Sequence, residues 1–232
     1  MHSSWNLFEK LWLSIFLLIG WVIAYVQQDN WLSFIVLLTG IVCVVLAAKG
    51  NITNYYFGLF NSCCYAYICY HNGLYGEMAL NLLFFVPTGI LGIFFWQKHI
   101  QNQQLLTVRS LSLSYLWLIL VFNLICIGLL GYALAQIATQ NTPYIDATTN
   151  ILAIFATFLM MLRYKEQWYF YILLNAFSIL MWWIRTLDGS QEGLMMLVMW
   201  SAFLINAFYG FYNWRKMASV PSSSIFAPEQ KI

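Results

Sequence analysis

Long apolar stretches, separated by short polar connections, run through most of this chain. There are eight of them, and each is about as long as the 17–25 residues or so that a helix needs to cross the hydrocarbon core of a membrane. They cover residues 11–26, 31–48, 55–71, 78–96, 111–136, 144–162, 168–184 and 193–214. The pattern therefore predicts an all-α membrane protein with eight transmembrane helices in the lipid bilayer.

The charged residues between these stretches predict the orientation. Threading the chain back and forth places nine of the 10 Lys and Arg residues on one side and only Arg185 on the other. Asp29, Asp146, Asp188 and Glu192 share the side of Arg185. Because an excess of Lys and Arg marks the cytoplasmic side, both termini are predicted to be inside. The outer loops are then 27–30, 72–77, 137–143 and 185–192.

Composition excludes a soluble protein. Hydrophobic residues make up 62% of the chain and charged residues 8%, whereas a soluble domain carries about 25% charged residues. Eight helices leave no room for a separate soluble catalytic domain among the 232 residues. The basic residues already serve as topology signals, so the net charge of +2 gives no reason to expect a nucleic-acid partner.

Two parts of the chain resemble each other and predict an internal repeat. Four helices separate the starts of the two similar triplets, so both enter the membrane from the same side, with the fifth stretch as a linker. This is a parallel 3+1+3 arrangement, known from SWEET-type transporters, here preceded by one extra helix. The matched positions are Tyr55 and Asn61 against Tyr169 and Asn175, and 92–98 against 210–216.

The repeat divides the chain into five parts. Thr142 and Pro143 mark the start of a helix in the second triplet, with threonine as the expected N-cap and proline at the first helical position. The parts are an extra N-terminal transmembrane helix (1–30), the first triple-helix repeat (31–97), a loop and linker helix (98–140), the second triple-helix repeat (141–216) and a disordered tail (217–232).

Four asparagines lie well inside predicted spans. A primary amide in hydrocarbon is costly unless it has a partner, so each must face a neighbouring helix or a cavity. Asn61 and Asn175, and likewise Asn81 and Asn206, occupy corresponding helices of the two repeats. They are expected to converge near the axis between the repeats, where such transporters bind substrate. The alternative is hydrogen bonding between helices, worth about 0.6 kcal/mol per contact.

Aromatic residues follow these amides at helical spacing. Rings three to four or seven to eight residues beyond an asparagine fall near its face of the helix. An amide beside a stacking ring suits a flat polar heterocycle that bears a sugar; the alternative is that the rings are core or lipid-facing filler. The predicted substrate-binding residues are Asn61, Asn81, Phe84, Phe85, Gln136, Thr149, Asn175, Trp182, Trp183 and Asn206.

The absence of charged residues at mid-membrane further limits the substrates and transport mechanisms that the sequence suggests. No Lys or Arg lies at mid-membrane, so a phosphorylated substrate would have no charged partner. Glu77 and Asp146 are placed near outer helix ends, so no carboxylate is expected beside the site and ion coupling is disfavoured. Pro87 lies deep in the fourth stretch, where it predicts a kink and a candidate hinge.

Catalytic and cofactor motifs are absent from the sequence. The three histidines are too scattered for a metal or haem site, and no H-E-x-x-H, G-x-S-x-G or Walker-type pattern occurs. The five cysteines lie inside predicted spans without a C-x-x-C spacing, which favours packing over the redox chemistry of a disulfide-bond oxidase. No enzyme activity, metal or cofactor is predicted.

Several segments together resemble the PnuC nicotinamide riboside transporters, over about residues 31–216. They are the run Asn54-Tyr-Tyr-Phe-Gly-Leu-Phe-Asn61, Leu74-Tyr75, Trp96, Pro143-Tyr-Ile-Asp146, Glu166-Gln-Trp168, Asn175 and Asn206. At Asn81 the chain departs from the family, which more often has Gln nearby in a shifted register. The extra helix within 1–30 is a second departure, since many members lack it.

The resemblance implies a seven-helix core with a SWEET-like 3+1+3 fold. It also implies facilitated diffusion of nicotinamide riboside across the bacterial inner membrane, uptake driven by cytoplasmic phosphorylation without a coupled ion, and a homotrimer. Three alternatives stay open from the residues themselves. They are a SWEET-like sugar facilitator, a facilitator for another vitamin or nucleoside such as riboflavin or thiamine, and a membrane enzyme or quinone-binding subunit.

Overall fold

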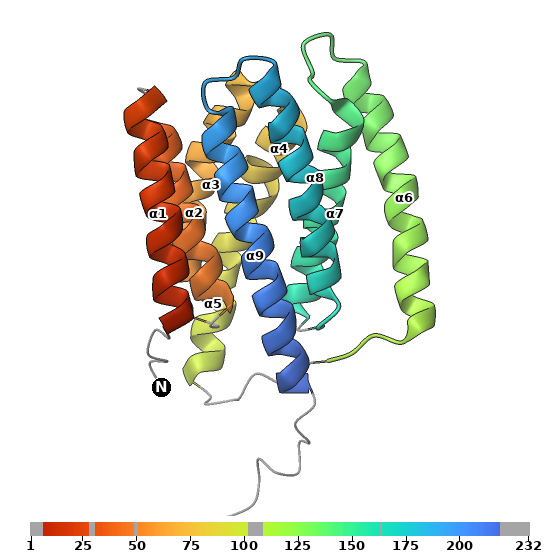
Figure 1. Cartoon of the computed structure of the whole chain (residues 1–232). Helices are drawn as coiled ribbons and strands as arrows, with labels where there is room; N and C mark the ends of the chain where they lie inside the picture. Colours follow the sequence, from red (N-terminus) through yellow and green to blue (C-terminus); the bar gives the residue numbers. More distant parts are fainter. Residues whose placement is uncertain (1–6, 28–30, 49–50, 102–108, 163, 219–232) are drawn as a thin grey trace, which may run out of the picture.

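The computed structural model describes residues 7–27, 31–48, 51–101, 109–162 and 164–218, and it shows a bundle of helices that run up and down side by side (Figure 1). Segments α4, η1 and α5 follow one another without a break, so the described residues form eight helical segments, one for each predicted apolar stretch. The elements are α1 (Leu7–Gln27), α2 (Trp31–Ala48), α3 (Asn54–His71), α4 (Tyr75–Leu80), η1 (Asn81–Phe85), α5 (Val86–Gln101), α6 (Leu113–Ala135), α7 (Pro143–Met161), α8 (Gln167–Leu187) and α9 (Gly193–Ala218).

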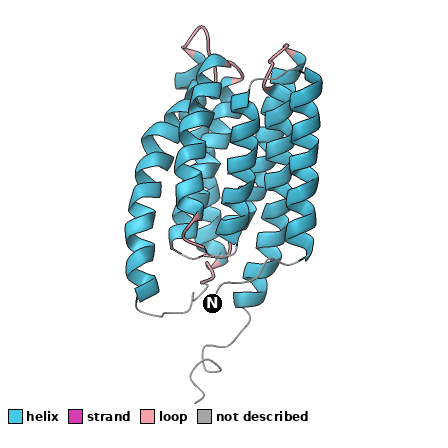
Figure 2. Cartoon of the chain, turned by 90° about the vertical axis from the view of Figure 1, so that its left-hand side faces the viewer, coloured by secondary structure: helices cyan, strands magenta, loops and turns pink. Residues whose placement is uncertain are grey.

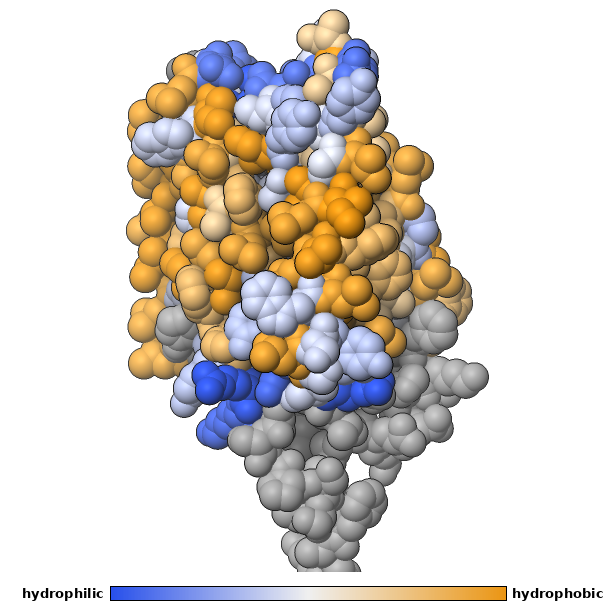
Figure 3. Space-filling view, turned by 90° about the vertical axis from the view of Figure 1, so that its right-hand side faces the viewer, coloured by the Kyte–Doolittle hydropathy of each residue, from blue (hydrophilic) through white to orange (hydrophobic). Residues whose placement is uncertain are grey.

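The surface and the helix lengths identify a multi-pass membrane protein. A broad apolar band covers the middle of the molecule, and hydrophilic residues gather at its two ends (Figure 3). Five segments are long and apolar enough to cross a membrane, and two further apolar helices, within 10–26 and 31–47, are shorter. The five are Tyr75–Phe94, Leu113–Ala135, Pro143–Met161, Gln167–Leu187 and Gly193–Lys216. Residues from 219 onward, most of the predicted tail, lie outside the described part.

Helix α2 lies near the middle of the packing. It contacts α1, α3 and α9, while α7 contacts α6, α8 and α4. The buried core includes Leu37 and Ile41 of α2, Trp182 of α8, and Met195 and Met199 of α9. Helix α6 stands at the edge of the bundle and contacts mainly α7 (Figure 1). Loops join the helices only at the two ends of the bundle, as the side view shows (Figure 2).

A π-helical turn interrupts the fourth segment just before its proline. In η1 the backbone N–H of Val86 donates to the carbonyl of Asn81, five residues earlier. Proline has no N–H and its ring clashes with the carbonyl four residues before it, so regular α-helical bonding cannot continue through Pro87. The chain accommodates Pro87 by widening the preceding turn, and such π-turns are frequent at functional sites.

The start of α7 is only partly as expected. Pro143 is the first residue of the helix, as predicted, but the predicted Thr142 cap is wrong, since its side chain forms no capping hydrogen bond. Thr142 has a left-handed backbone with φ of 42°, whereas a capping residue needs an extended backbone to turn its oxygen onto the first helical N–H groups. The loop before it is tied to the α3–α4 turn, where the N–H of Asn141 donates to the carbonyl of Gly73 over 2.8 Å.

Candidate functional site

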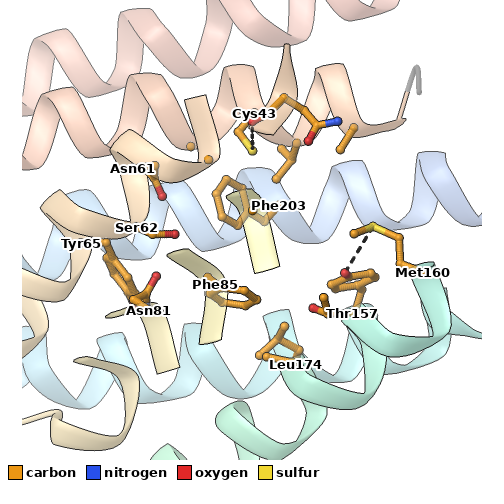
Figure 4. Close-up of a pocket in the computed structure, with 18 of the residues that line it drawn as sticks. Cys43, Asn61, Ser62, Tyr65, Asn81, Phe85, Thr157, Met160, Leu174 and Phe203 are labelled. Atoms are coloured by element: carbon orange, nitrogen blue, oxygen red, sulfur yellow. Dashed lines mark hydrogen bonds between the residues drawn. The ribbon is translucent and has the colours of Figure 1, made fainter. Parts of the chain in front are cut away.

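A cavity of about 260 Å³ lies inside the bundle (Figure 4). Residues of α2, α3, α4, η1, α5, α7, α8 and α9 line it, and α1 and α6 contribute none among the described residues. Its wall is mostly apolar, with a small number of amides and hydroxyls. Small-molecule sites are likewise mostly apolar with a few polar groups, and their volumes range upward from about 300 Å³. This cavity lies close to the lower limit of that range. The cavity therefore has the size and lining expected for one small organic ligand.

All four predicted asparagines line this cavity. Asn61 comes from α3, Asn81 from η1, Asn175 from α8 and Asn206 from α9. These helices belong to both halves of the chain, so amides far apart in the sequence lie around one cavity. Figure 4 shows Asn61 and Asn81 in this wall. Their function in binding stays a prediction, but the convergence expected from their positions is present.

Two of these amides also join helices. The Asn61 Nδ2 donates to the Val36 carbonyl over 2.7 Å and lies 3.0 Å from the Thr39 hydroxyl oxygen. The Asn206 Nδ2 donates to the Val44 carbonyl over 3.2 Å. Both bonds end on α2, so these amides hold α3 and α9 against it. The alternative considered from the sequence, hydrogen bonding between helices, therefore applies to Asn61 and Asn206 whatever else they do.

Asn175 differs from the other three. Asn81 donates from Nδ2 to the Glu77 carbonyl of the preceding turn over 2.9 Å. Asn175 is only 4% exposed and lines the cavity, yet within the described part of the chain no hydrogen bond involves its amide. A buried amide is costly to leave unsatisfied. Asn175 is therefore the asparagine whose hydrogen-bonding capacity is most fully available to a ligand.

The predicted aromatic residues separate into different environments. Phe85 lines the cavity, whereas Phe84 packs edge-on against Phe158 with 5.7 Å between ring centroids. Trp183 is 54% exposed on the outside of the bundle. Trp182, seven residues beyond Asn175, is fully buried one layer away from the cavity. Of these four aromatic residues, therefore, only Phe85 lines the cavity.

Trp182 instead supports an aromatic layer at one end of the cavity. Its indole N–H donates to the Tyr65 hydroxyl over 2.9 Å, and the Trp200 indole N–H donates to the same oxygen over 3.2 Å. Tyr65 and Trp200 line the cavity. With both indoles bonded to its oxygen, Tyr65 is held in place and keeps its own O–H as a donor. Trp182 thus positions a cavity residue without contacting the cavity itself.

Two other predicted residues lie elsewhere. Gln136 is exposed after the end of α6 and donates to the Tyr132 carbonyl over 3.1 Å. Thr149 is fully buried in α7 and donates to the Asp146 carbonyl over 2.8 Å. Neither lines the cavity.

Sequence reasoning missed several polar and aromatic cavity residues. Helical spacing contained a signal for them, because Ser62 and Tyr65 follow Asn61 by one and four residues on α3, and Phe203 precedes Asn206 by three on α9. Counting in both directions from each buried amide, and not only toward its C-terminal side, identifies these faces. The cavity residues that were missed include Ser62, Tyr65, Glu77, Thr157, Trp200 and Phe203.

The expectation that no carboxylate lies beside the site is wrong for Glu77. Glu77 is one of the residues that line the cavity, and it is 2% exposed. Asp146 is equally buried but does not line the cavity; it accepts hydrogen bonds from the Gly76 N–H (3.0 Å), Gln140 (2.6 Å) and Asn150 (2.8 Å). Glu77 was placed at an outer helix end by counting residues, and it does lie in the first turn of α4, but the cavity extends to that turn.

The cavity extends toward one end of the bundle. Ala47 at the end of α2, Asn54 at the start of α3, Met161 at the end of α7 and Trp168 at the start of α8 all line it. These helix ends lie at the same end of the molecule as the start of α1 and the end of α9 (Figure 1). The Tyr65, Trp182 and Trp200 layer lies toward the opposite end.

A family model described as "Nicotinamide mononucleotide transporter" matches residues 30–216. Two curated relatives, both named nicotinamide riboside transporter PnuC, are each 36% identical to this chain. The one from Neisseria mucosa matches over 94% of this chain and 84% of its own, and the one from Haemophilus influenzae over 93% and 92%. The relative of the same name from Escherichia coli K12 is 25% identical over 65% of this chain and 73% of its own.

The extent of these matches also shows that they include part of the first helix, α1. A match over 93% of the chain leaves fewer unmatched residues than the 21 of α1, so the two matches at 36% identity reach into that helix. A solved structure titled as that of the vitamin B3 transporter PnuC superposes with a TM-score of 0.79 at 33% identity, and covers 93% of this chain and 94% of its own. Each of these relatives is named as a transporter and not as an enzyme. The chain therefore belongs to the nicotinamide mononucleotide transporter family, which includes the PnuC proteins.

Proposed function

We propose that this protein carries nicotinamide riboside across the bacterial inner membrane through the cavity. The observation that carries the proposal is the lining of that cavity, in which five asparagine amides and several aromatic rings surround a space for one small ligand. Amides and hydroxyls suit a ribose and a carboxamide, and rings suit the flat heterocycle. The names of the Neisseria mucosa and Haemophilus influenzae relatives point to the same ligand.

The riboside is a better candidate for the ligand than the mononucleotide, which is the compound that the family description names. No Lys or Arg lies among the described residues that line the cavity. A phosphate group is bound in proteins by charged donors, and burying its charge without them costs several kcal/mol or more. Glu77 adds a further negative charge to this wall when it is ionised. The riboside lacks the phosphate and avoids both penalties.

The repeat architecture is part of the proposal. We take α2, α3 and α4–α5 as one triplet, α7, α8 and α9 as the second, α6 as the linker and α1 as the extra helix. The contacts support this assignment, because α2 packs on α9 just as α7 packs on α4, and α2–α3 has its counterpart in α7–α8. With eight spans, both ends of the described chain lie on one side, which we assign to the cytoplasm.

Positions of the described charges support that assignment. Lys10, Arg109, Lys165 and Arg215 lie at or beyond the helix ends on the side of the termini. Arg185 lies at the other end and is paired with Asp188 over 3.0 Å. A side rich in Lys and Arg is the cytoplasmic side in bacterial membrane proteins.

Transport is proposed to be facilitated diffusion. The riboside would equilibrate across the membrane without a coupled ion, and phosphorylation in the cytoplasm would keep its concentration low and drive net uptake. A homotrimer completes the proposal, as the family resemblance implies, and the mass of the purified protein in detergent tests it.

The central experiment measures binding and transport by purified full-length protein. Calorimetric titration with nicotinamide riboside, nicotinamide, the mononucleotide, thiamine, riboflavin and glucose should give binding of the riboside alone. Liposomes that contain the protein should then equilibrate the riboside without a proton or sodium gradient. Binding of glucose in place of the riboside would support a sugar facilitator, and accumulation that an ionophore abolishes would show ion coupling.

A further inference from the structure

We infer that the Glu77 carboxylate is the counter-charge that makes the cavity select a cationic ligand. The inference rests on the proposed function, because the nicotinamide ring of the riboside is a pyridinium ion with a permanent positive charge. Reduction of that ring to the 1,4-dihydropyridine gives a neutral molecule of nearly the same shape. The two forms therefore separate recognition of charge from recognition of shape.

Glu77 and Asp146 form an internal comparison between two buried carboxylates. Asp146 is satisfied by the protein, since both of its oxygens accept hydrogen bonds from neighbouring N–H groups. The Glu77 Oε1 has no hydrogen-bond partner among the described residues, although Glu77 lines the cavity and is almost completely buried. The protein thus compensates both oxygens of one carboxylate and leaves an oxygen of the other, cavity-lining residue without a partner.

A negative charge in such a place is costly unless an opposite charge approaches it, and the Asp146 carboxylate that acts on Glu77 has the same sign. Among the described residues that line the cavity there is no Lys, Arg or His, so this part of the wall supplies no cation to pair with Glu77. A ligand cation would supply the missing charge. The aromatic faces of Tyr65, Trp200 and Phe203 in the same wall favour a cation as well, because the ring face is electron-rich.

The backbone around Glu77 keeps this carboxylate in position. The Gly76 N–H is bonded to Asp146, and a Cβ at Gly76 would lie 2.7 Å from the Asp146 Oδ1, so only glycine allows this close approach. One turn later, the Asn81 amide donates to the Glu77 carbonyl. The backbone at Glu77 is therefore held on both sides, at a residue that lines the cavity.

The test titrates purified full-length protein with nicotinamide riboside and with its reduced, neutral form. Glu77→Gln keeps the size and removes the charge, and it should weaken binding of the cationic riboside by about ten- to hundredfold. Binding of the neutral form should stay within about threefold of that by the unmodified protein. Glu77→Asp keeps the charge on a shorter side chain and should retain a preference for the cation.

Asp146→Asn is the matched control. It removes the same formal charge from a carboxylate that does not line the cavity, and asparagine keeps a side-chain oxygen that can accept the Gly76 N–H bond that positions Glu77. It should therefore lower the melting temperature and leave the ratio of the two affinities unchanged. The inference would be overturned if Glu77→Gln lost affinity equally for both ligands, or if it lost no affinity for the cationic riboside. Failure of the unmodified protein to bind either ligand would instead refute the proposed function. If Glu77→Gln does not purify, Glu77→Asp takes its place, and loss of its preference for the cation would overturn the inference equally.

Discussion

Replacing Asn175 by alanine should separate binding from stability. Within the described part of the chain no hydrogen bond involves the Asn175 amide, so its removal breaks no contact that holds the helices together. Alanine is also the better helix former by about 0.5 kcal/mol. The free energy of unfolding should therefore change by less than about 1 kcal/mol. A polar group of the ligand that loses its buried partner costs about 1–3 kcal/mol, which corresponds to a dissociation constant raised about ten- to hundredfold.

Asn61→Ala is the matched comparison. Its amide contacts the Val36 carbonyl and the Thr39 hydroxyl on a neighbouring helix, and two such bonds contribute about 1–3 kcal/mol together. This variant should lose stability even where no ligand is present. Asn61 also lines the cavity, so its affinity can fall too, but only Asn175→Ala should lose affinity at an unchanged melting temperature.

Melting temperature and riboside affinity should be measured on the same purified samples. A chain of this size shifts its melting temperature by about 2–4 °C per kcal/mol, so the two variants are readily distinguished. Asn175→Ala with a lowered melting temperature and an unaltered dissociation constant would refute the reasoning. Asn175 would then be a structural amide, and the ligand would have to bind elsewhere.

Three further predictions concern selectivity, the aromatic layer and topology. The mononucleotide should bind at least about a hundredfold more weakly than the riboside, because the described part of the cavity wall contains no cation; comparable affinities in a titration would contradict this. Trp182→Phe removes the indole bond to Tyr65 and should lower both the melting temperature and the affinity for the riboside. Trp183 lies on the exposed face, so Trp183→Phe should leave the melting temperature unchanged and alter the affinity by no more than about twofold. On a cysteine-free background, a cysteine at 139 should label from outside intact cells, and one at 102 should not; labelling at 102 from outside would exclude the eight-span topology.

The helical bundle was predictable because its signal is repeated along the whole chain. Each span is a long apolar run, and an error at one boundary leaves the others intact. The four asparagines were predictable for a related reason, since a buried amide in hydrocarbon must face a partner or a cavity. Their positions in corresponding helices then placed them around one space.

The aromatic part of the site was harder to predict. Residues seven positions apart share a helix face, which placed Trp182 correctly on the face of Asn175 but not at its depth in the bundle. Trp182 lies in the layer behind Tyr65. How far a side chain lies from the cavity depends on which neighbouring helix packs against it at that height in the membrane. A single sequence does not show where helices cross one another. Glu77 was misjudged for the same reason, because its distance from the helix end was known and the extent of the cavity was not.

The π-helical turn at Asn81–Phe85 has a consequence for how related chains diverge. A π-turn contains one residue more than an α-helical turn, so it can absorb the gain or loss of a single residue locally, whereas the same change in a regular α-helix rotates everything beyond it by about 100°. Glu77 before the turn and the residues of α5 after it can therefore keep their faces when the number of residues between them changes by one. An insertion or deletion of one residue inside a membrane span is thus tolerated at this turn. An alignment that forbids gaps within helices would misassign Phe85 and the residues that follow it.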